Sequence, residues 1–523
     1  MAKRPVRGAV DRIDRRNLIY FILYNWVNAV FNEYYRKVEV RGLENIPGDA
    51  PVIFTPNHQN ALMDALIVLF SSPGDTVFLA RADLFKKKIL AYLLNSLKIL
   101  PVFRIRDGVE ELGKNQEIFD ITVGVLHRKH QLCLMPEGNH GDKRRLRRIG
   151  KGVFRIAFST QEKMGNQPYV KIVPVGLDFS DYIKHYQTLY VNYGKPIEVA
   201  DYWDAYAENP ARGTNLLKER FTGEIKKLMI HIETEDFYDL YMGLRTVFNE
   251  RMRALMDIDG DSLHDRFVAD KEMIRRLNGV LAEYEAQSEQ PADSESQSAT
   301  DSSVATEPQP VTGQPANTAS DPSAGHPATG QPADTDHDPA AGQSADPDHP
   351  LVQLREKTEA YFNGLKVMNL RDWVVKSGGY SGGHTAWRWL TLVLTFPVFV
   401  YGLVNNALVY FLPVRAVRGI KDVQFHSSVK AGLAMLVVVP FSYFIQTLLV
   451  GIFTGPWYWW VAYLVTLYPM GKLALWWYLR LKKTLRGSWF RRQVRREKQS
   501  ATGLIQLRKN IITDTEKLIG KTA

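Results

Sequence analysis

Two long segments near the C-terminus, 431–453 and 457–479, limit what this chain can fold into. Both are rich in aromatic residues and nearly free of charge, apart from Lys472 near the end of the second. An apolar stretch of about 20 residues can cross the hydrocarbon core of a bilayer as a helix, and a lysine near its end can reach the interface. Only residues 454–456 separate the two segments. The pattern predicts a tight pair of transmembrane helices.

A third apolar segment, 389–412, is also long enough to span. Four residues interrupt its middle: Pro397, Gly402, Asn405 and Asn406. Basic residues lie in the loop after it and again from Arg480 onward, and basic loops favour the cytoplasmic side. A re-entrant segment keeps both basic regions on that side, whereas a single crossing does not. We therefore expect an integral membrane protein with a membrane domain over 389–479 and a basic cytoplasmic tail over 480–523.

The stretch 286–350 has a composition unlike the rest of the chain. Pro, Ala, Gly, Ser, Thr, Gln, Asp and His dominate it, and almost nothing in it could enter a core. Such a segment cannot bury enough apolar surface to offset the entropy of ordering, so we predict a disordered acidic linker. Apolar stripes at helical spacing precede it, in a helical extension over 201–285, and follow it, in an amphipathic helix over 351–388. Facing stripes would make these two helices a hairpin.

The N-terminal region, 1–36, combines a basic start with an aromatic-rich apolar run from Leu18 to Phe31. This run is too short to cross about 30 Å of hydrocarbon as a helix. Basic residues before it and aromatic residues within it favour a helix that lies in the membrane interface. An ordinary core helix is the alternative.

The formal net charge of +10 understates how basic the chain is outside its linker, because no Lys or Arg occurs between Arg276 and Arg355. Nucleic acid is one partner that a basic surface can take. Here the basic residues flank apolar segments, so an anionic membrane is the better match, and we expect no nucleic acid.

Strand and helix patterns alternate between residues 37 and 200. We expect short apolar strands at 52–54, 76–79, 132–135, 171–175 and 189–193. We expect helices between them at 61–70, 87–97, 110–126 and 152–163. This alternation predicts an α/β domain with helices on the faces of its sheet. Sites in open α/β sheets usually lie at strand ends, which is where the chemically distinctive residues of this chain stand.

Asn57-His58 follows the first of these strands, and Asp64 stands six positions beyond His58. A histidine held by a carboxylate is the usual arrangement of a general base, because the carboxylate fixes the tautomer and stabilises the imidazolium. One such spacing is a weak signal. Three further blocks follow it in order: Leu100–Asp107 (LPVFRIRD), Met135–Gly138 (MPEG) and Ile172–Gly176 (IVPVG).

The ordered set of four blocks resembles the glycerolipid acyltransferase family, which acylates glycerol phosphate and lysophosphatidic acid, over roughly 38–199. The family's commonest first block has four residues between His and Asp, whereas five stand between His58 and Asp64. On one regular helix the extra residue would rotate Asp64 by about 100°. We therefore expect His58 in the strand-to-helix turn and Asp64 inside the helix. This spacing and the Pro101–Arg104 block resemble the subgroup that acts on glycerol 3-phosphate and dihydroxyacetone phosphate.

The resemblance implies a fold, a reaction and a catalytic pair. The fold would be a glycerolipid acyltransferase-like sheet with flanking helices, together with the C-terminal transmembrane helices. The reaction would move a fatty acyl group from an acyl-CoA or acyl carrier protein thioester to a glycerol hydroxyl. His58 would take the proton of the hydroxyl and Asp64 would hold His58.

The resemblance also implies residues that bind the substrate or shape its site: Asn57, Arg104, Arg106, Glu137, Gly138, Lys151 and Pro174. Arg104 is the first candidate for the acceptor phosphate and Arg106 the second, because Arg binds phosphate in bidentate geometry. Backbone N–H groups of Glu137 and Gly138 would stabilise the oxyanion. Alternatively, Glu137 anchors backbone N–H groups, and the basic run 143–151 is a solvated or membrane-facing surface.

No pattern of His, Cys, Asp and Glu predicts a metal, no cofactor is expected, and the single cysteine, Cys133, fits an inert core thiol. We expect a membrane-bound O-acyltransferase of phospholipid biosynthesis that acts on glycerol phosphate, with its catalytic domain facing the cytoplasm. Lysophosphatidic acid or another lysophospholipid is the alternative acceptor. A non-enzymatic membrane protein that holds lipid or tethers a partner is the alternative of another class, although the complete His58/Asp64 and PEG blocks speak against it.

Overall fold

The computed structural model describes Ile13 and residues 18–86, 88–102, 114–165, 169–288, 349–420 and 422–520. Within these residues, an eight-stranded mixed sheet has the order β1-β7-β6-β2-β5-β3-β4, and β8 pairs beside β6. Its strands are β1 (Lys37–Arg41), β2 (Val52–Pro56), β3 (Thr76–Arg81), β4 (Ile99–Val102), β5 (Gln131–Cys133), β6 (Lys171–Phe179), β7 (Thr188–Tyr193) and β8 (Ile197–Glu198). The central strand β2 runs parallel to both β5 and β6, and the five predicted strands are confirmed.

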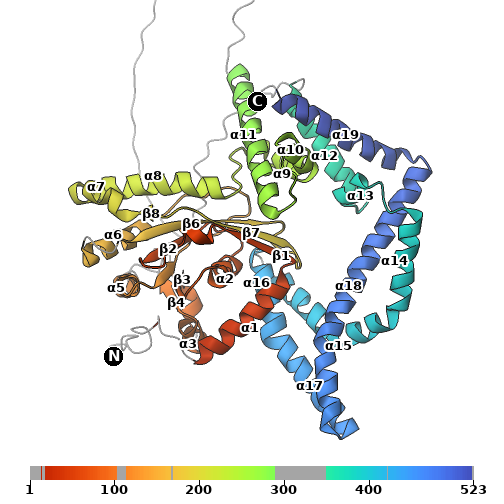
Figure 1. Cartoon of the computed structure of the whole chain (residues 1–523), viewed down its shortest axis with the longest axis horizontal. Helices are drawn as coiled ribbons and strands as arrows, with labels where there is room; N and C mark the ends of the chain where they lie inside the picture. Colours follow the sequence, from red (N-terminus) through yellow and green to blue (C-terminus); the bar gives the residue numbers. More distant parts are fainter. Residues whose placement is uncertain are drawn as a thin grey trace, which may run out of the picture.

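Helices cover both faces of the sheet (Figure 1). Those of the sheet domain are α1 (Leu18–Tyr34), α2 (Leu62–Ser71), α3 (Lys88–Ser96), α5 (Lys114–His127), α6 (Gly152–Met164), α7 (Trp203–Glu208) and α8 (Pro210–Leu228). Successive strand residues face opposite sides. Ile53 and Leu132 pack with α5, α6 and α8, whereas Phe54 and Cys133 pack with α1 and α2. Burial raises the pKa of the Cys133 thiol well above its usual range, which fits the inert core thiol that we predicted.

The helix α1 is partly a core helix and partly an exposed apolar one. Its Phe31 packs on Phe70 of α2, with ring centroids 5.3 Å apart, and Phe31 is buried. Several apolar side chains near its start are exposed instead: Leu18, Phe21, Ile22 and Trp26. One face of α1 thus lies in the core, as the core-helix alternative expects, and a membrane-interface role for the exposed apolar face stays a prediction.

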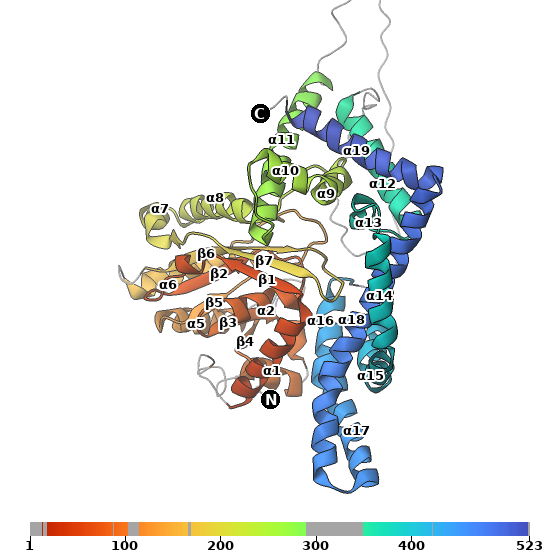
Figure 2. The same cartoon turned by 45° about the vertical axis from the view of Figure 1, so that its right-hand side comes forward.

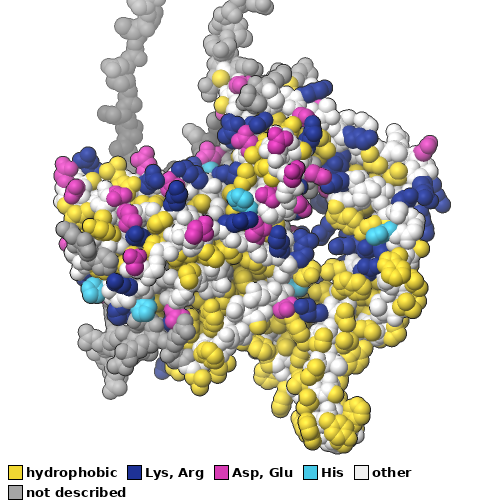
Figure 3. All heavy atoms as spheres, viewed as in Figure 1, with side chains coloured by type: hydrophobic (Ala, Val, Ile, Leu, Met, Phe, Trp, Pro, Cys, Tyr) yellow, Lys and Arg dark blue, Asp and Glu magenta, His cyan; other side chains and the backbone are white. Residues whose placement is uncertain are grey.

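The C-terminal helices form an arm beside the sheet domain. They are α14 (Gly382–Leu394), α15 (Phe396–Ala416), α16 (Phe425–Gly432), a π-helical segment (Leu433–Val438), α17 (Val439–Thr454) and α18 (Trp457–Arg495). Two of the described helices, Phe396–Gly419 and Phe425–Thr454, are long and apolar enough to cross a membrane, by length and composition. Figure 2 shows α17 and the first part of α18 projecting from the molecule as a hairpin. Hydrophobic side chains cover this apolar hairpin (439–479), and Lys and Arg gather above it (Figure 3).

The predicted segment 389–412 differs from the structure in where it is interrupted. The break falls at Thr395, between α14 and α15, whereas Gly402 and Asn406 lie inside α15 at its contact with α18. A Cβ on Gly402 would lie 2.2 Å from the Met470 carbonyl oxygen. These residues therefore permit close helix packing, and they do not break the helix as the sequence suggested.

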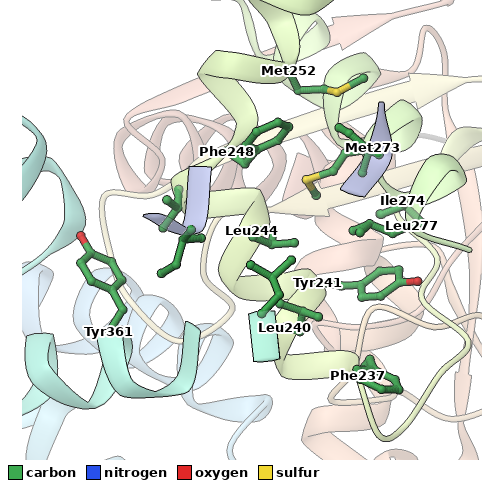
Figure 4. Packing of buried hydrophobic residues seen from close by; sticks show 14 of the residues in the cluster. Phe237, Leu240, Tyr241, Leu244, Phe248, Met252, Met273, Ile274, Leu277 and Tyr361 are labelled. Carbon is green, nitrogen blue, oxygen red and sulfur yellow. The ribbon is translucent and has the colours of Figure 1, made fainter. Parts of the chain in front are cut away.

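A second core lies among helices on the far side of β7 (Figure 4). Its helices are α9 (Tyr238–Val247), α10 (Asn249–Leu255), α11 (Leu263–Ser288), α12 (Pro350–Val367), α13 (Asp372–Lys376) and α19 (Gln499–Ile519). The stripes of α11 and α12 both enter this core, but α12 packs mainly on α9 and α19, so the expected two-helix hairpin is wrong in its pairing. The tail beyond Arg480 is likewise mostly helical, and it buries Ile511 here. The linker lies outside the described residues between 289 and 348.

Candidate active site

The turn between β2 and α2 brings His58 and Asp64 together. β2 ends at Pro56 and α2 begins at Leu62, so His58 lies in the turn and Asp64 in the first helical turn, as predicted. His58 Nδ1 lies 2.9 Å from Asp64 Oδ2. The turn absorbs the extra residue through Ala61, whose φ of 45° is unusual for a residue with a Cβ. Asp64 is fully buried, and the His58 side chain is 16% exposed.

The hydrogen bonds of Asp64 assign the tautomer of His58. Asp64 Oδ2 also accepts the backbone N–H groups of Gln59 and Asn60, each at 2.8 Å. An ionised carboxylate only accepts, so His58 Nδ1 carries the proton and Nε2 keeps its lone pair. The position of Asp64 near the N-terminus of α2 also favours its negative charge. The pair can therefore take a proton from a hydroxyl that approaches Nε2.

The turn formed by Pro136, Glu137 and Gly138, here called the PEG turn, packs against the backbone of His58. Glu137 Oε1 accepts the His58 N–H at 2.8 Å, and its Oε2 accepts the Arg147 N–H at 3.1 Å. Burial raises the pKa of Glu137 to about 7, although both N–H bonds lower it. The Gly138 N–H donates to the Met135 carbonyl at 3.2 Å. Gly138 is therefore not available for the predicted oxyanion role, and the N–H of Glu137 is the remaining candidate.

The structure places three other predicted site residues, Asn57, Pro174 and Lys151, and no hydrogen bond among the described residues joins any of them to the His58 side chain. The buried side chain of Asn57 accepts the Leu177 N–H at 2.7 Å and donates to the Leu177 carbonyl at 3.2 Å, which ties the end of β2 to β6. Pro174 is buried in β6 opposite Thr55. Lys151 is exposed just before α6, and no contact among the described residues joins it to His58. The site thus brings His58, Asp64 and Glu137 together. Both polar atoms of the Asn57 side chain are already hydrogen-bonded to Leu177, so this side chain has a structural role.

The predicted phosphate ligands Arg104 and Arg106 lie in 103–113, outside the described residues. Within the basic run 143–151, several residues have partners that the sequence did not indicate, among them Lys143 and Arg144. Lys143 pairs with Glu235 at 2.5 Å. Arg144 is buried, and its Nε donates to Asp178 at 3.1 Å. Arg144 therefore belongs to neither a solvated nor a membrane-facing surface.

Sequence reasoning missed a segment that reaches the site from far along the chain. Asp422 Oδ2 lies 2.7 Å from Nε2 of His140, although the two residues are 282 positions apart. The ring of His140 lies beside the ring of His58, with centroids 5.5 Å apart. No spacing in one sequence signals a contact over such a separation.

Comparisons with known proteins concern the part of the chain that holds this site. Residues 37–178 match the family model described as Acyltransferase, whereas no curated protein matches. Among solved structures, the 1-acyl-sn-glycerophosphate (LPA) acyltransferase PlsC from Thermotoga maritima matches with 20% identity and a TM-score of 0.28, over 38% of this chain and 79% of that one. The range matched by the family model holds His58, Asp64 and the PEG turn. Over residues 37–178, this chain is therefore similar to the Acyltransferase family.

Proposed function

We propose that this protein is a membrane-bound O-acyltransferase that moves a fatty acyl group from a thioester donor to a hydroxyl of a glycerol phosphate. The observation that carries the proposal is the His58–Asp64 pair, 2.9 Å apart at the end of β2. Asp64 is itself fixed by two backbone N–H groups, so the imidazole is oriented before the substrate arrives. Such preorganisation is what a general base requires.

The reaction needs no covalent intermediate on the enzyme. His58 Nε2 takes the hydroxyl proton while the hydroxyl oxygen attacks the thioester carbonyl, which becomes an oxyanion. Collapse of the tetrahedral intermediate breaks the C–S bond, and the imidazolium returns its proton to the departing thiolate. Asp64 stabilises the imidazolium in between. The N–H of Glu137 is our candidate donor to the oxyanion, and the thioester is a substrate, so no cofactor takes part.

Arg104 is our first candidate for the phosphate of the acceptor, and Arg106 the second. The support is the resemblance of the Pro101–Arg104 block. A lysophosphatidic acid acceptor carries the same phosphate, so the same residues would serve both acceptors. Arg104→Ala should raise the acceptor KM at least about tenfold and change the donor KM little, with partial recovery in Arg104→Lys. Equal effects on both KM values would assign Arg104 to the fold.

The membrane part of the proposal is supported by the apolar hairpin and by the helix path. Phe453 and Trp457, on either side of the hairpin tip, are 85% and 72% exposed, which suits a lipid surrounding. Both α14 and α15 pack against α18, and α15 also packs against α16, which is compatible with a re-entrant pair of helices. Single cysteines placed at residue 320 and at Ala523 should both resist an impermeant thiol reagent in intact cells. Labelling of either one would reject this topology.

The decisive experiment assays membranes that contain this protein with glycerol 3-phosphate and lysophosphatidic acid in parallel. Each acceptor is paired with acyl-CoA and with acyl carrier protein thioester, and membranes with His58→Ala serve as the control. Transfer to glycerol 3-phosphate, lost in His58→Ala, supports the proposal. Transfer to lysophosphatidic acid alone favours the alternative acceptor. Absence of any transfer by the folded, membrane-bound protein favours a non-enzymatic lipid tether.

A further inference from the structure

The loop that follows the PEG turn lies directly against the catalytic histidine. The Gly141 N–H donates to the His58 carbonyl at 3.1 Å. The ring of His140 stands edge-on to the ring of His58, at 5.5 Å between centroids and 87° between planes. Together with the bond from the His58 N–H to Glu137, these contacts hold the backbone of His58 at both its N–H and its carbonyl and limit rotation of its ring.

The other side of the same loop is held by the segment that leads into the apolar hairpin, here called the hairpin root (422–430). Asp422 Oδ2 lies 2.7 Å from His140 Nε2. The side chain of Gln424 donates to the Gly141 carbonyl. The ring of Phe425 meets the ring of His140 at 5.2 Å and 83°. The loop 139–141 is therefore clamped between the catalytic turn and the hairpin root.

These contacts enclose the ring of His140 on three sides. His58 and Phe425 both meet it edge-to-face, which is a favoured arrangement of aromatic rings, and Asp422 accepts its Nε2 proton. The side chain of His140 is accordingly only 10% exposed, whereas Asp422 is 45% exposed. A carboxylate on the hairpin root thus sets the orientation of the ring that packs on the catalytic base.

We propose that His140 and Asp422 are positioning residues, through which the hairpin root holds His58 in its reactive orientation. This inference rests on the proposed role of His58 as the base. The ring of His58 must keep Nδ1 on Asp64 and direct Nε2 at the acceptor hydroxyl at the same time. Rotation of the ring about its side-chain bonds would disturb both the bond to Asp64 and the direction of Nε2. Misplacement of a reacting group by about 1 Å can cost on the order of 100-fold in rate.

If Asp422 only stabilised the fold, its removal would lower the melting temperature and the turnover together. Ion pairs with a largely solvated partner contribute only about 0–1 kcal/mol to stability, and Asp422 is nearly half exposed. Its removal should therefore change the melting temperature little. An effect on turnover that exceeds the effect on stability separates positioning from folding.

The test uses the full-length protein in lipid vesicles. Asp422→Ala should lower kcat about tenfold and leave both KM values within about twofold. Asp422→Asn, which keeps an acceptor oxygen, should recover most of the lost kcat. The matched control is Glu516→Ala, which removes a partly exposed carboxylate that pairs with Arg251 between α10 and α19, and it should leave kcat unchanged.

A second readout does not depend on turnover. Modification of His58 by diethyl pyrocarbonate, followed by mass spectrometry, should be faster in Asp422→Ala and in His140→Ala than in the unmodified protein. An unchanged modification rate and kcat in folded Asp422→Ala would overturn the proposal, as would a rise in acceptor KM alone, which indicates substrate contact. If the unmodified protein transfers no acyl group at all, the proposed function fails, and the modification rate still decides whether Asp422 positions His58.

Discussion

The sheet domain and the apolar helices α15, α17 and the first part of α18 follow opposite rules for the side chains that they bury. Phe54, in the central strand, is fully buried, whereas Phe444, in α17, is 68% exposed. The polar Asn406 of α15 is 2% exposed. Its amide donates to the carbonyls of Gly402 and Leu467 and accepts from Tyr443.

This contrast has a simple cause if lipid surrounds these apolar helices, as we propose. Water drives apolar side chains into the core of the sheet domain. Lipid tails provide no such drive, so helices in a bilayer associate through close packing at small residues and through hydrogen bonds. Gly402, Gly451 and Gly471 allow this close packing, because a Cβ on any of them would lie within 3 Å of a neighbouring helix. The two regions should therefore respond differently to mutation.

The largest effect should come from His58→Ala, which acts on the chemistry of the sheet domain alone. We expect acyl transfer to fall about 10³–10⁴-fold, since the general base is lost, while membrane association stays unchanged. Asp64→Asn should cost less but still orders of magnitude, because orientation and charge stabilisation are lost. Steady-state rates together with membrane flotation measure both. Near-normal turnover in purified His58→Ala would end the proposed mechanism.

The second test compares truncations in the two regions. Phe54→Ala should reduce the free energy of unfolding of the sheet domain by about 3–5 kcal/mol, because it empties a packed core. Asn406→Ala should weaken the helix contacts by about 1 kcal/mol, and the exposed Phe444→Ala should change little in lipid. Unfolding in vesicles, followed by domain-specific fluorescence labels, measures each. A cost for Phe444→Ala equal to that of Phe54→Ala would show that α17 packs against protein.

The same contrast explains what the sequence predicts and what it leaves out. The strands around Ile53 and Leu132 and the His58–Asp64 geometry follow from local patterns, because residues close in sequence determine them. The Asp422–His140 contact depends on how a helical arm docks on the sheet domain, and no local pattern records that. Predictions from glycine can be wrong for another reason. In the sequence Gly402 suggests a break in the helix, but in the structure it lies at a close contact between two helices.

A smaller, pH-dependent effect concerns Glu137, a polar group that the sheet domain partly buries. Its pKa is about 7 in the folded protein against an ordinary 4.5. Between these values the unfolded chain has released a proton that the folded protein still holds, so stability falls as pH rises from about 4.5 to about 7. Glu137→Gln should remove this slope.

Melting temperatures at pH 4.5 to 8 would measure the effect of Glu137. The unmodified protein should lose stability relative to Glu137→Gln as pH rises across that range, and the difference should become constant above about pH 8. Glu162→Gln, on the exposed face of α6, is the matched control and should show no such trend. Parallel slopes for Glu137→Gln and the unmodified protein would contradict a raised pKa at Glu137.

The smallest effect should come from shortening the linker between α11 and α12. The rings of Tyr284 and His349, on either side of it, lie 4.3 Å apart, whereas a flexible segment with the length of 289–348 has a root-mean-square span of roughly 40–45 Å. A connector of about ten Gly and Ser residues covers the distance from Ser288 to His349, since an extended residue spans about 3.3 Å. Closing a shorter loop costs less entropy, by about 0.6 kcal/mol for each halving of the loop length.

Replacement of 289–348 by such a connector should therefore leave folding, membrane insertion and acyl transfer within about twofold of the unmodified protein, and the melting temperature should rise slightly. A scrambled linker of full length is the control. Loss of activity in the shortened protein, with activity retained in the scrambled one, would mean that the sheet domain and the helical arm need a spacer between them that the packing of α11 and α12 does not reveal.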